Sequence, residues 1–390
     1  MTRRAWIGSA CAVGAVLWLA LFLQRHERPD FSDFHVYWVA GEKAARHLTA
    51  YDVEGHYQFK YSPFVALLWS VPTYIGSERL WSGLHYVVTG IGWYTLLFWF
   101  ARQVDKNRAW MLWAAGVVVF SVAIRDELKL GQVNLWPFLL VLPAWVARRP
   151  TRAGRDARGF WIGAAWGLAV QWKLYALLLA PLWLLRRRAA VFAGAVASTL
   201  LTLVAVPALV HGWTFAVSEN LRWLTSLTDS SQALLVSRYN VSLLGVLGKA
   251  ADGFGLSLGV WAYLIWVAVL ITGLWTVVWA ERRNPDRLPL FWSASFCWAL
   301  VAVVNPLVWP YWQLLAAPLF LIYLARGTER DWRGDDAVFW PVLGAFAVMN
   351  WAQNSPLVHY GGGLVALLAL LGDARRRASR PATATPLGAG

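Results

Sequence analysis

Charged residues are scarce in this chain: Asp, Glu, Lys and Arg make up only 14% of its 390 residues. A soluble globular protein usually carries about 25% of them. The hydrophobic share is 58% and the mean hydropathy is +0.47, which is more apolar surface than a soluble domain can bury. The shortage of charge therefore excludes an ordinary soluble fold and predicts an all-α polytopic membrane protein.

Cysteine is almost absent as well. Cys11 and Cys297 both lie inside apolar runs, where they form neither a disulfide framework nor a Cys/His metal spacing. No cofactor and no metal are expected. The chain also has no phosphate-binding loop, because Gly248-Lys249 lacks the earlier Gly and the following Ser or Thr, and it has no His-Glu-x-x-His. These absences argue against an ATP-driven pump and a membrane zinc protease.

Long apolar runs, in contrast, are abundant, and the 28 Trp residues suit the boundary between water and lipid. A helix needs about 20 apolar residues to cross a bilayer core of about 30 Å, although shorter buried spans occur. On this basis we expect about 12 transmembrane helices in one domain, residues 1–377, followed by a disordered cytoplasmic tail at 378–390. The expected spans are residues 5–23, 80–101, 109–124, 133–147, 159–171, 172–185, 189–210, 257–280, 289–304, 311–325, 337–350 and 362–372.

The net charge of +14 is spread in short clusters between these runs, which argues against nucleic acid as a partner. If residues 61–76 do not cross the bilayer, the connectors on the N-terminal side hold 23 Lys and Arg in 61 residues, and the opposite connectors hold 11 in 127 residues. Short basic loops stay in the cytoplasm. We therefore interpret 61–76 as a re-entrant or interfacial segment of a cell-membrane protein, with both termini cytoplasmic and the segments 24–79 and 211–256 outside.

Two residues stand out for their chemistry. Asp33 lies among aromatic residues in the first outer segment, where a carboxylate acts either as a general base or simply as a solvated loop charge. Lys173 separates two apolar runs, each only about 18–20 Å long as a helix. A helix break at Gln171-Trp172-Lys173 would lie below the outer surface, which requires neighbouring protein or a water-filled cavity. A Lys there suits a phosphate; the alternative is a Lys that snorkels to the headgroups.

Several motifs of the outer connectors resemble those of glycosyltransferase family 87. In the first outer loop they are Asp33-Phe34-His35-Val36-Tyr37, Ala50-Tyr51-Asp52 and Phe59-Lys60-Tyr61-Ser62-Pro63-Phe64. The later ones keep the family order: Gly131-Gln132-Val133-Asn134, Lys173-Leu174-Tyr175, Ser237-Arg238-Tyr239-Asn240 and Asn305-Pro306-Leu307-Val308-Trp309. The resemblance covers roughly residues 5–325.

The resemblance implies a C-type glycosyltransferase fold and metal-independent transfer of mannose from a polyprenyl-phosphate donor. The acceptor would be an extracytoplasmic lipid or glycan, and the sugar centre would invert in a single displacement. Asp33 takes the role of the catalytic base, and Lys173 contacts the donor or its phosphate. The full set of expected substrate-binding residues is His35, Tyr37, Lys60, Tyr61, Gln132, Asn134, Lys173, Arg238, Asn240, Trp309 and Tyr311.

Two alternatives remain open. A membrane transporter or lipid flippase would use the same charges as a substrate path, although such proteins often carry inverted repeats and no clear repeat is visible here. An inactive relative is the other alternative, because the family often has a His pair where this chain has Tyr311 and Trp312.

The charge asymmetry gives a testable topology. We expect positions near 45 and 230 to react with a membrane-impermeant thiol reagent in intact cells, and positions 152 and 330 to be protected. The measurement uses single-cysteine variants after replacement of Cys11 and Cys297. Labelling of position 152 in intact cells would contradict the topology.

Overall fold

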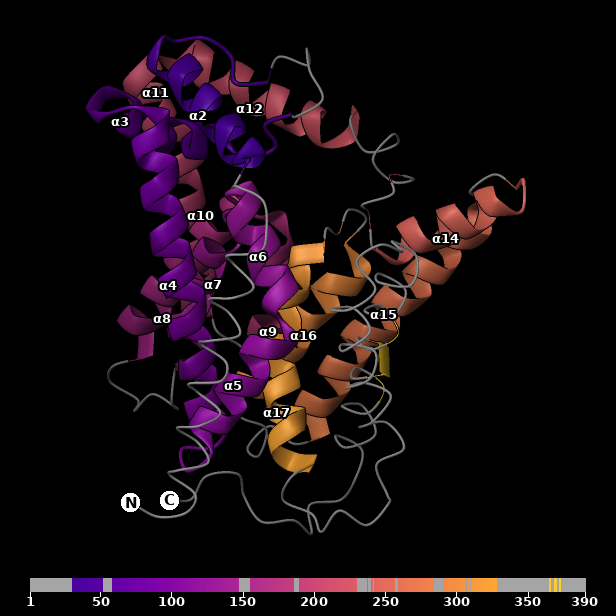
Figure 1. Ribbon diagram of the computed structural model, residues 1–390. Coiled ribbons are helices and arrows are strands. Elements are labelled where there is room, and N and C mark those ends of the chain that lie inside the picture. Colours follow the sequence, from indigo (N-terminus) through magenta and orange to yellow (C-terminus); the bar gives the residue numbers. More distant parts are fainter. Residues whose placement is uncertain are drawn as a thin grey trace. The chain divides into compact units, whose positions relative to one another are not determined.

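The computed structural model describes residues 30–51, 58–146, 155–185, 189–229, 242–256, 259–283, 290–305 and 310–327, with a few single positions besides (Figure 1). Every regular element in these ranges is helical, so the expected all-α class is confirmed. The expected spans at 5–23 and 337–350, most of 362–372, and the tail at 378–390 lie outside the described residues.

Three helical stretches among the described residues are long and apolar enough to cross a membrane. They are α4 (Glu78–Val104), the stretch Ala189–His211, and Val260–Arg282 within α15 (Val260–Arg283), and they match three of the expected spans. A fourth candidate is a bent pair, α5 (Ala109–Val119) and α6 (Ser121–Leu130), with an angle of 62° at the break. The described residues thus support three to four spans, and the expected number of about 12 is not confirmed.

The remaining helices are shorter. The stretch Ala189–His211 comprises α10 (Ala189–Leu200), the π-helical turn η3 (Leu201–Ala205) and α11 (Val206–His211). The others are α2 (Ser32–Ala45), α3 (Pro63–Ile75), α7 (Leu135–Val146), α8 (Arg155–Trp172), η2 (Leu174–Leu179), α9 (Ala180–Leu185), α12 (Trp213–Asp229), α14 (Leu243–Gly253), α16 (Leu290–Val304), η4 (Pro310–Ala316) and α17 (Ala317–Gly327).

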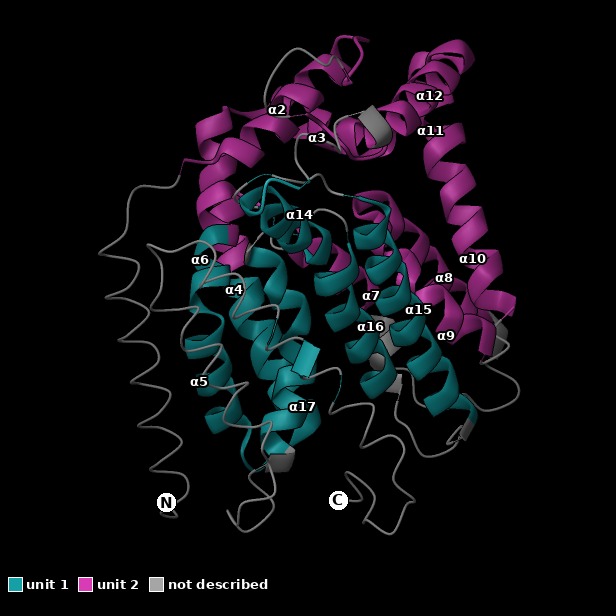
Figure 2. Ribbon diagram, turned by 90° about the vertical axis from the view of Figure 1, so that its right-hand side faces the viewer, with its two compact units in different colours: residues 1–27, 91–126, 235–390 teal, residues 28–90, 127–234 magenta. Residues whose placement is uncertain are grey.

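The chain forms two compact units, coloured separately in Figure 2. Unit 1 contains residues 1–27, 91–126 and 235–390, and unit 2 contains residues 28–90 and 127–234. Within unit 2, the helices α2, α3, α11 and α12 gather at the same end of α10 (Figure 1). The two outer segments expected from the sequence therefore contain regular helices, which their polar composition did not reveal.

The segment 61–76 forms the helix α3. Pro63 occupies its first turn, where the missing N–H costs nothing. The helix packs against α2 so closely that a Cβ on Gly41 would overlap the carbonyl oxygen of Trp69. At 13 residues, α3 is among the shorter apolar helices. Its assignment as a re-entrant or interfacial segment stays a prediction.

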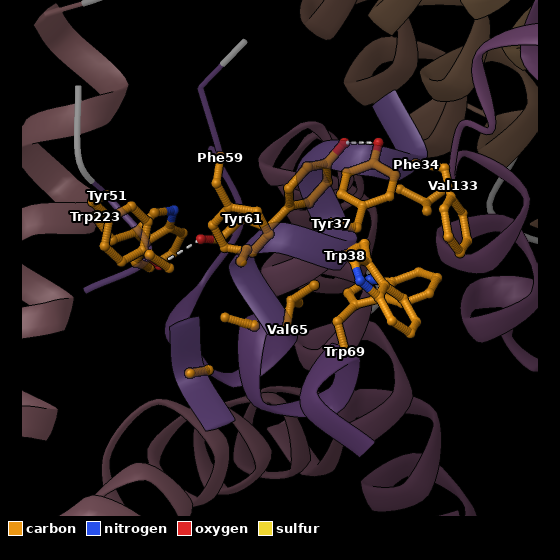
Figure 3. Close-up of a cluster of buried hydrophobic side chains, with 14 residues drawn as sticks. Phe34, Tyr37, Trp38, Tyr51, Phe59, Tyr61, Val65, Trp69, Val133 and Trp223 are labelled. Atoms are coloured by element: carbon orange, nitrogen blue, oxygen red, sulfur yellow. Dashed lines mark hydrogen bonds between the residues drawn. The ribbon is translucent and has the colours of Figure 1, made fainter. Parts of the chain in front are cut away.

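A cluster of buried aromatic rings joins α2 to α3 (Figure 3). Tyr37 stacks on Trp69 with ring centroids 5.7 Å apart, and Phe34 meets the same indole edge to face at 5.2 Å. From α12, the Nε1–H of Trp223 donates to the carbonyl oxygen of Lys60 at 3.1 Å. Aromatic pairs of this kind add about 0.5–1.5 kcal/mol each beyond their buried area, so the cluster holds the 58–62 loop in a defined place.

Glycines bring α8 and α10 into backbone contact. Gly159, Gly163 and Gly167 recur every four residues along α8 and face α10. A Cβ on Gly163 would overlap the carbonyl oxygen of Val191, and one on Gly194 would overlap the carbonyl oxygen of Phe160. Small residues at such spacing let helices in a membrane approach closely, where dispersion replaces the missing hydrophobic effect.

The close packing predicts opposite effects for two helical glycines. Replacing Gly by Ala inside a helix normally gains about 1 kcal/mol of helix propensity. Gly163→Ala should nevertheless lower the Tm of the purified protein in detergent, because overpacking costs about 1–3 kcal/mol. Gly83→Ala is the matched control: beyond the surrounding turns of its own helix, no atom of the described residues lies within 4 Å of its added Cβ, so its Tm should be unchanged or higher. An unchanged Tm in Gly163→Ala would contradict the packing.

Candidate active site

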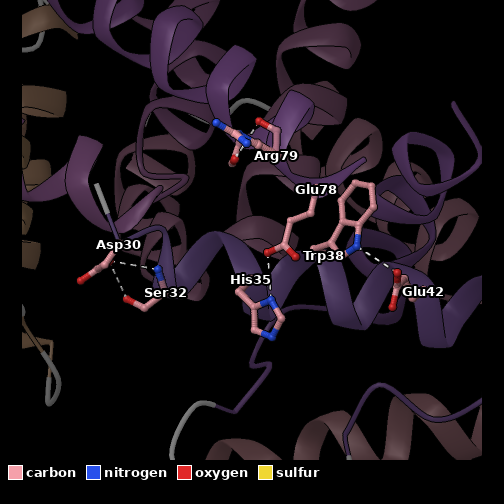
Figure 4. A network of polar contacts seen from close by, with 8 residues as sticks. Asp30, Ser32, His35, Trp38, Glu42, Glu78 and Arg79 are labelled. Carbon is pink, nitrogen blue, oxygen red and sulfur yellow. Dashed lines mark hydrogen bonds and ion pairs between the residues drawn. The ribbon is translucent and has the colours of Figure 1, made fainter. Parts of the chain in front are cut away.

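The first turn of α2 carries Asp33. Asp30 begins the helix by accepting hydrogen bonds from the Ser32 N–H at 3.0 Å and the Ser32 hydroxyl at 3.1 Å (Figure 4). The N–H of Phe31 donates to the carbonyl oxygen of Lys129 at 3.0 Å, which ties the start of α2 to the end of α6. Residues four apart share a helix face, so Asp33 and Tyr37 point to the same side.

Gln132 connects this face of α2 to the buried tyrosines. Its Nε2–H donates to Oδ2 of Asp33, and its Oε1 accepts from the Tyr37 hydroxyl at 3.3 Å. The Tyr37 hydroxyl in turn lies 2.8 Å from the Tyr61 hydroxyl (Figure 3). The amide group is thus oriented from both ends. In the described part of the chain, no hydrogen bond reaches Oδ1 of Asp33.

A tight turn between α6 and α7 sets the position of Gln132. The N–H of Gln132 donates to the carbonyl oxygen of Glu127 at 2.9 Å, and the N–H of Gly131 donates to that of Leu128 at 3.2 Å. This pair of bonds is the Schellman arrangement, which needs a left-handed residue. Gly131 supplies it with φ +71°, and a Cβ there would lie 2.7 Å from Cβ of Phe34.

His85 of α4 secures the same turn from the other side. Its Nε2–H donates to the carbonyl oxygen of Gln132 at 2.8 Å. The imidazole is buried and also contacts the ring of Phe34, with centroids 5.4 Å apart. His85 thereby holds the main chain of the residue whose side chain contacts Asp33.

The helix break expected at Gln171-Trp172-Lys173 is confirmed. α8 ends at Trp172, Lys173 is extended with φ −151° and ψ 113°, and η2 begins at Leu174. The Lys173 Nζ lies over the Tyr61 ring, 4.7 Å from its centroid, within the range of a cation–π contact. Its positive charge also acts on the Asp33 carboxylate. The break therefore brings a cation to the Asp33 side of the molecule.

Sequence reasoning missed three members of this site. Glu127 is fully buried and accepts hydrogen bonds from the main-chain N–H of Asn134 at 2.9 Å and from its Nδ2–H at 2.7 Å. The Tyr175 hydroxyl donates to Oδ1 of Asn134 at 3.2 Å. The third is His85, which holds the turn. Little sequence signal marked Glu127, because it stands among other charged residues, Arg125, Asp126 and Lys129.

Burial raises the pKa of Asp33 from 3.8 to about 6. The hydrogen bond from Gln132 and the charge of Lys173 both lower this pKa, whereas the nearby Asp30 raises it, and burial outweighs the rest. Burial also lowers the pKa of Lys60 and raises that of Tyr61. Asp33 is therefore ionised at neutral pH and is a stronger base than an ordinary aspartate.

Two of the expected site residues of unit 2 do not join this constellation through their side chains. His35 is exposed, and its Nδ1 pairs with Oε1 of Glu78 at 2.8 Å (Figure 4). It lies two residues from Asp33, on the opposite face of α2. Lys60 contributes its carbonyl oxygen to the Trp223 contact, while its side chain is partly buried.

Four of the expected site residues belong to unit 1, and two of these four are described. Asn240 is fully buried, and its Oδ1 accepts from the main-chain N–H groups of Ser242 at 3.1 Å and Val308 at 3.0 Å. Tyr311 is buried in η4. Arg238 and Trp309 lie outside the described residues. Among the residues that are described, no group of three or more His, Cys, Asp or Glu is arranged to hold a metal ion.

Comparison with known proteins identifies one family. The model of glycosyltransferase family 87 matches residues 59–310, well over half of the chain. This range includes Glu127, Gln132, Asn134 and Lys173, while Asp33 precedes it. No curated protein and no solved structure matches the chain.

Proposed function

The chain belongs to glycosyltransferase family 87, and from this premise we propose that it transfers mannose from a polyprenyl-phosphate donor to a hydroxyl of a lipid or glycan acceptor. Family membership makes it a membrane glycosyltransferase. The donor, the acceptor class and the extracytoplasmic side of the reaction are part of the proposal. The side follows from the distribution of Lys and Arg.

Asp33 is the proposed catalytic base, and its hydrogen bond with Gln132 is the observation that carries the assignment. Gln132 holds Oδ2, which leaves Oδ1 to accept the proton of the acceptor hydroxyl. A general base works best when its pKa lies near the working pH, and burial raises the pKa of Asp33 to about 6. The carboxylate is thus ionised at neutral pH, oriented and unusually basic.

Lys173 is proposed to stabilise the polyprenyl phosphate as it leaves. A single displacement forms the new bond from the acceptor oxygen while the bond to the phosphate oxygen breaks, and negative charge develops on that phosphate. A positioned cation stabilises such charge. The Lys173 Nζ lies 4.7 Å from the Tyr61 ring centroid, and the hydroxyl of Tyr61 joins the hydrogen-bonded chain of Tyr37 and Gln132 that ends at Asp33, which supports a base and a cation that serve one sugar. The lipid phosphate is itself an energised leaving group, so no ATP site is required.

The remaining expected contacts belong to the same proposal. Tyr37, Tyr61 and Gln132 are joined by hydrogen bonds to one another, and Lys173 lies over the Tyr61 ring; these contacts support Tyr37, Tyr61, Gln132 and Asn134 as further substrate contacts. His35, Lys60, Asn240 and Trp309 are retained as proposed substrate contacts. Arg238 is the proposed second cation for the phosphate, and Tyr311 would donate one hydrogen bond where the family often has His.

Replacing the base should abolish transfer without unfolding the protein. Asn is nearly the same size as Asp but a very weak base, so Asp33→Asn should lower the rate about 10²–10⁴-fold. The exposed Asp30, and Asp52 from the same outer segment of the sequence, supply controls, and their Asn variants should retain transfer. The measurement is sugar transfer by purified protein from polyprenyl-phosphate mannose to a lipid extract.

The pH dependence follows from the same carboxylate. Only ionised Asp33 accepts a proton, so kcat/KM of the wild type should fall as the pH drops below about 6.

Nucleotide-linked mannose supplied instead of the lipid donor should give no product. Equal transfer from the nucleotide sugar, or a fully active Asp33→Asn enzyme, would refute the proposed function; an inactive wild type would identify the chain as an inactive relative.

Removing the Lys173 charge should weaken use of the donor much more than it weakens folding. Lys173→Met should weaken use of the polyprenyl-phosphate donor by about tenfold or more while the protein remains folded, because a charge-assisted contact with phosphate contributes about 1.5–3 kcal/mol. Lys173→Arg keeps the charge but changes its geometry, so it should retain part of the activity. Donor titrations and size-exclusion profiles report the two effects. Turnover of Lys173→Met at the wild-type rate would show that the phosphate role is wrong.

A further inference from the structure

The proposed reaction gives no role to the buried carboxylate of Glu127, near the end of α6. Its side chain is fully buried. Transfer of a carboxylate from water into a protein interior costs several kcal/mol unless hydrogen bonds and an opposite charge offset it. The contacts that offset this cost therefore indicate the role of the Glu127 carboxylate.

The first of these contacts lies at the beginning of α7. The main-chain N–H of Asn134, immediately before α7, donates to Oε1 of Glu127 at 2.9 Å, and the Asn134 Nδ2–H donates to Oε2 at 2.7 Å. A helix N-terminus favours a negative charge. Both carboxylate oxygens are thus fixed by one residue, and the charge is stabilised where it is buried.

Tyr175 then fixes Asn134. The Tyr175 hydroxyl donates to Oδ1 of Asn134 at 3.2 Å, so the amide must turn its Nδ2–H toward Glu127. Tyr175 lies two residues after Lys173, just beyond the helix break. One short segment therefore supplies both the cation and the hydroxyl that indirectly orients Glu127.

The second contact is electrostatic. The charges of Glu127 and Asp33 both act on the Lys173 ammonium group, so one cation is shared by two carboxylates. The other ionisable groups that act on these three, or on which they act, are Asp30, Tyr61 and Tyr175, while His85 contacts the main chain of Gln132. Of the carboxylates near Lys173, only Glu127 is locked by two hydrogen bonds from a helix start.

We propose that Glu127 is a positioning residue that holds the Lys173 ammonium between the catalytic base and the donor phosphate. The inference rests on the proposed function and deepens it. Glu127 itself touches neither sugar nor phosphate. It acts through Lys173, by attracting the ammonium group away from Asp33 and fixing where that group lies when the donor binds.

The proposal predicts a change in pH dependence that a merely structural residue would not produce. With Glu127→Gln, the Lys173 charge acts on Asp33 alone, and the ionised form of Asp33 is then favoured. The acid limb of the pH profile of kcat/KM should move to lower pH than in the wild type. The value of kcat/KM on the plateau should fall about tenfold, as expected for a coupled neighbouring group, because the cation is no longer held near the phosphate.

The neighbouring carboxylate supplies a matched control. Asp126 pairs with Nη2 of Arg125 at 2.7 Å, and Asp126→Asn removes a charge one residue away from Glu127. Its acid limb and plateau should match those of the wild type. An acid limb in Glu127→Gln that stays in place or moves to higher pH would overturn the proposal, as would an equal shift in Asp126→Asn.

A double variant keeps the test independent of the folding of Glu127→Gln. Loss of both charges of a buried pair is tolerated better than loss of one, so Glu127→Gln is also introduced into Lys173→Met. If Glu127 acts through Lys173, the double variant should have the kcat/KM and the acid limb of Lys173→Met alone. A further tenfold loss would mean that Glu127 acts by another route, and the proposal would be wrong.

Different results would contradict the proposed glycosyl transfer and the proposed role of Glu127. Absence of transfer from polyprenyl-phosphate mannose by the wild type, or full activity in Asp33→Asn, would remove the proposed function itself. Transfer by the wild type and loss in Asp33→Asn, together with an unshifted profile in Glu127→Gln, would remove only the role of Glu127.

Discussion

The contact between the Gln132 amide and the Asp33 carboxylate is the interaction on which the rest of the site depends. One end of the amide holds the carboxylate, and the other accepts from the Tyr37 hydroxyl. A Schellman turn with Gly131 at positive φ and a hydrogen bond from His85 place the residue. Because buried polar groups are costly when unpaired, each member of this hydrogen-bonded chain requires the next, and the proposed base is oriented before any substrate arrives.

The balance of charge gives the site its chemistry. The charges of two carboxylates, Asp33 and Glu127, both act on the Lys173 ammonium group. An anionic lipid phosphate would compete with both for that cation. If the ammonium group moves toward the phosphate, its attraction on Asp33 weakens. The pKa of Asp33 then rises, and the carboxylate becomes a stronger base. Donor binding and base strength are thus linked by ordinary electrostatics.

Much of this arrangement was predictable from local rules, and the rest depended on tertiary packing. The break at Lys173 followed from two apolar runs that were too short to span a bilayer, and the all-α class followed from composition. The sequence analysis did not recognise α2 as a helix, whose periodicity puts His35 opposite Asp33 and next to Glu78; the role of His35 as a substrate contact stays a prediction. Glu127 was missed because the sequence around it does not distinguish a buried carboxylate from a solvated one; its two hydrogen bonds from Asn134 depend on how the turn between α6 and α7 folds. The glycine repeat at Gly159, Gly163 and Gly167 was readable, but its partner helix was not.

The most direct test of the central claim is an experimental structure of the protein with a non-transferable phosphonate analogue of polyprenyl-phosphate mannose. The account predicts a phosphonate oxygen within hydrogen-bonding distance of the Lys173 Nζ, about 2.7–3.2 Å. It also predicts that the face of the sugar opposite the phosphonate is turned toward Oδ1 of Asp33, with room for an acceptor hydroxyl between them. A phosphonate bound away from Lys173, or a sugar whose open face is remote from Asp33, would contradict it.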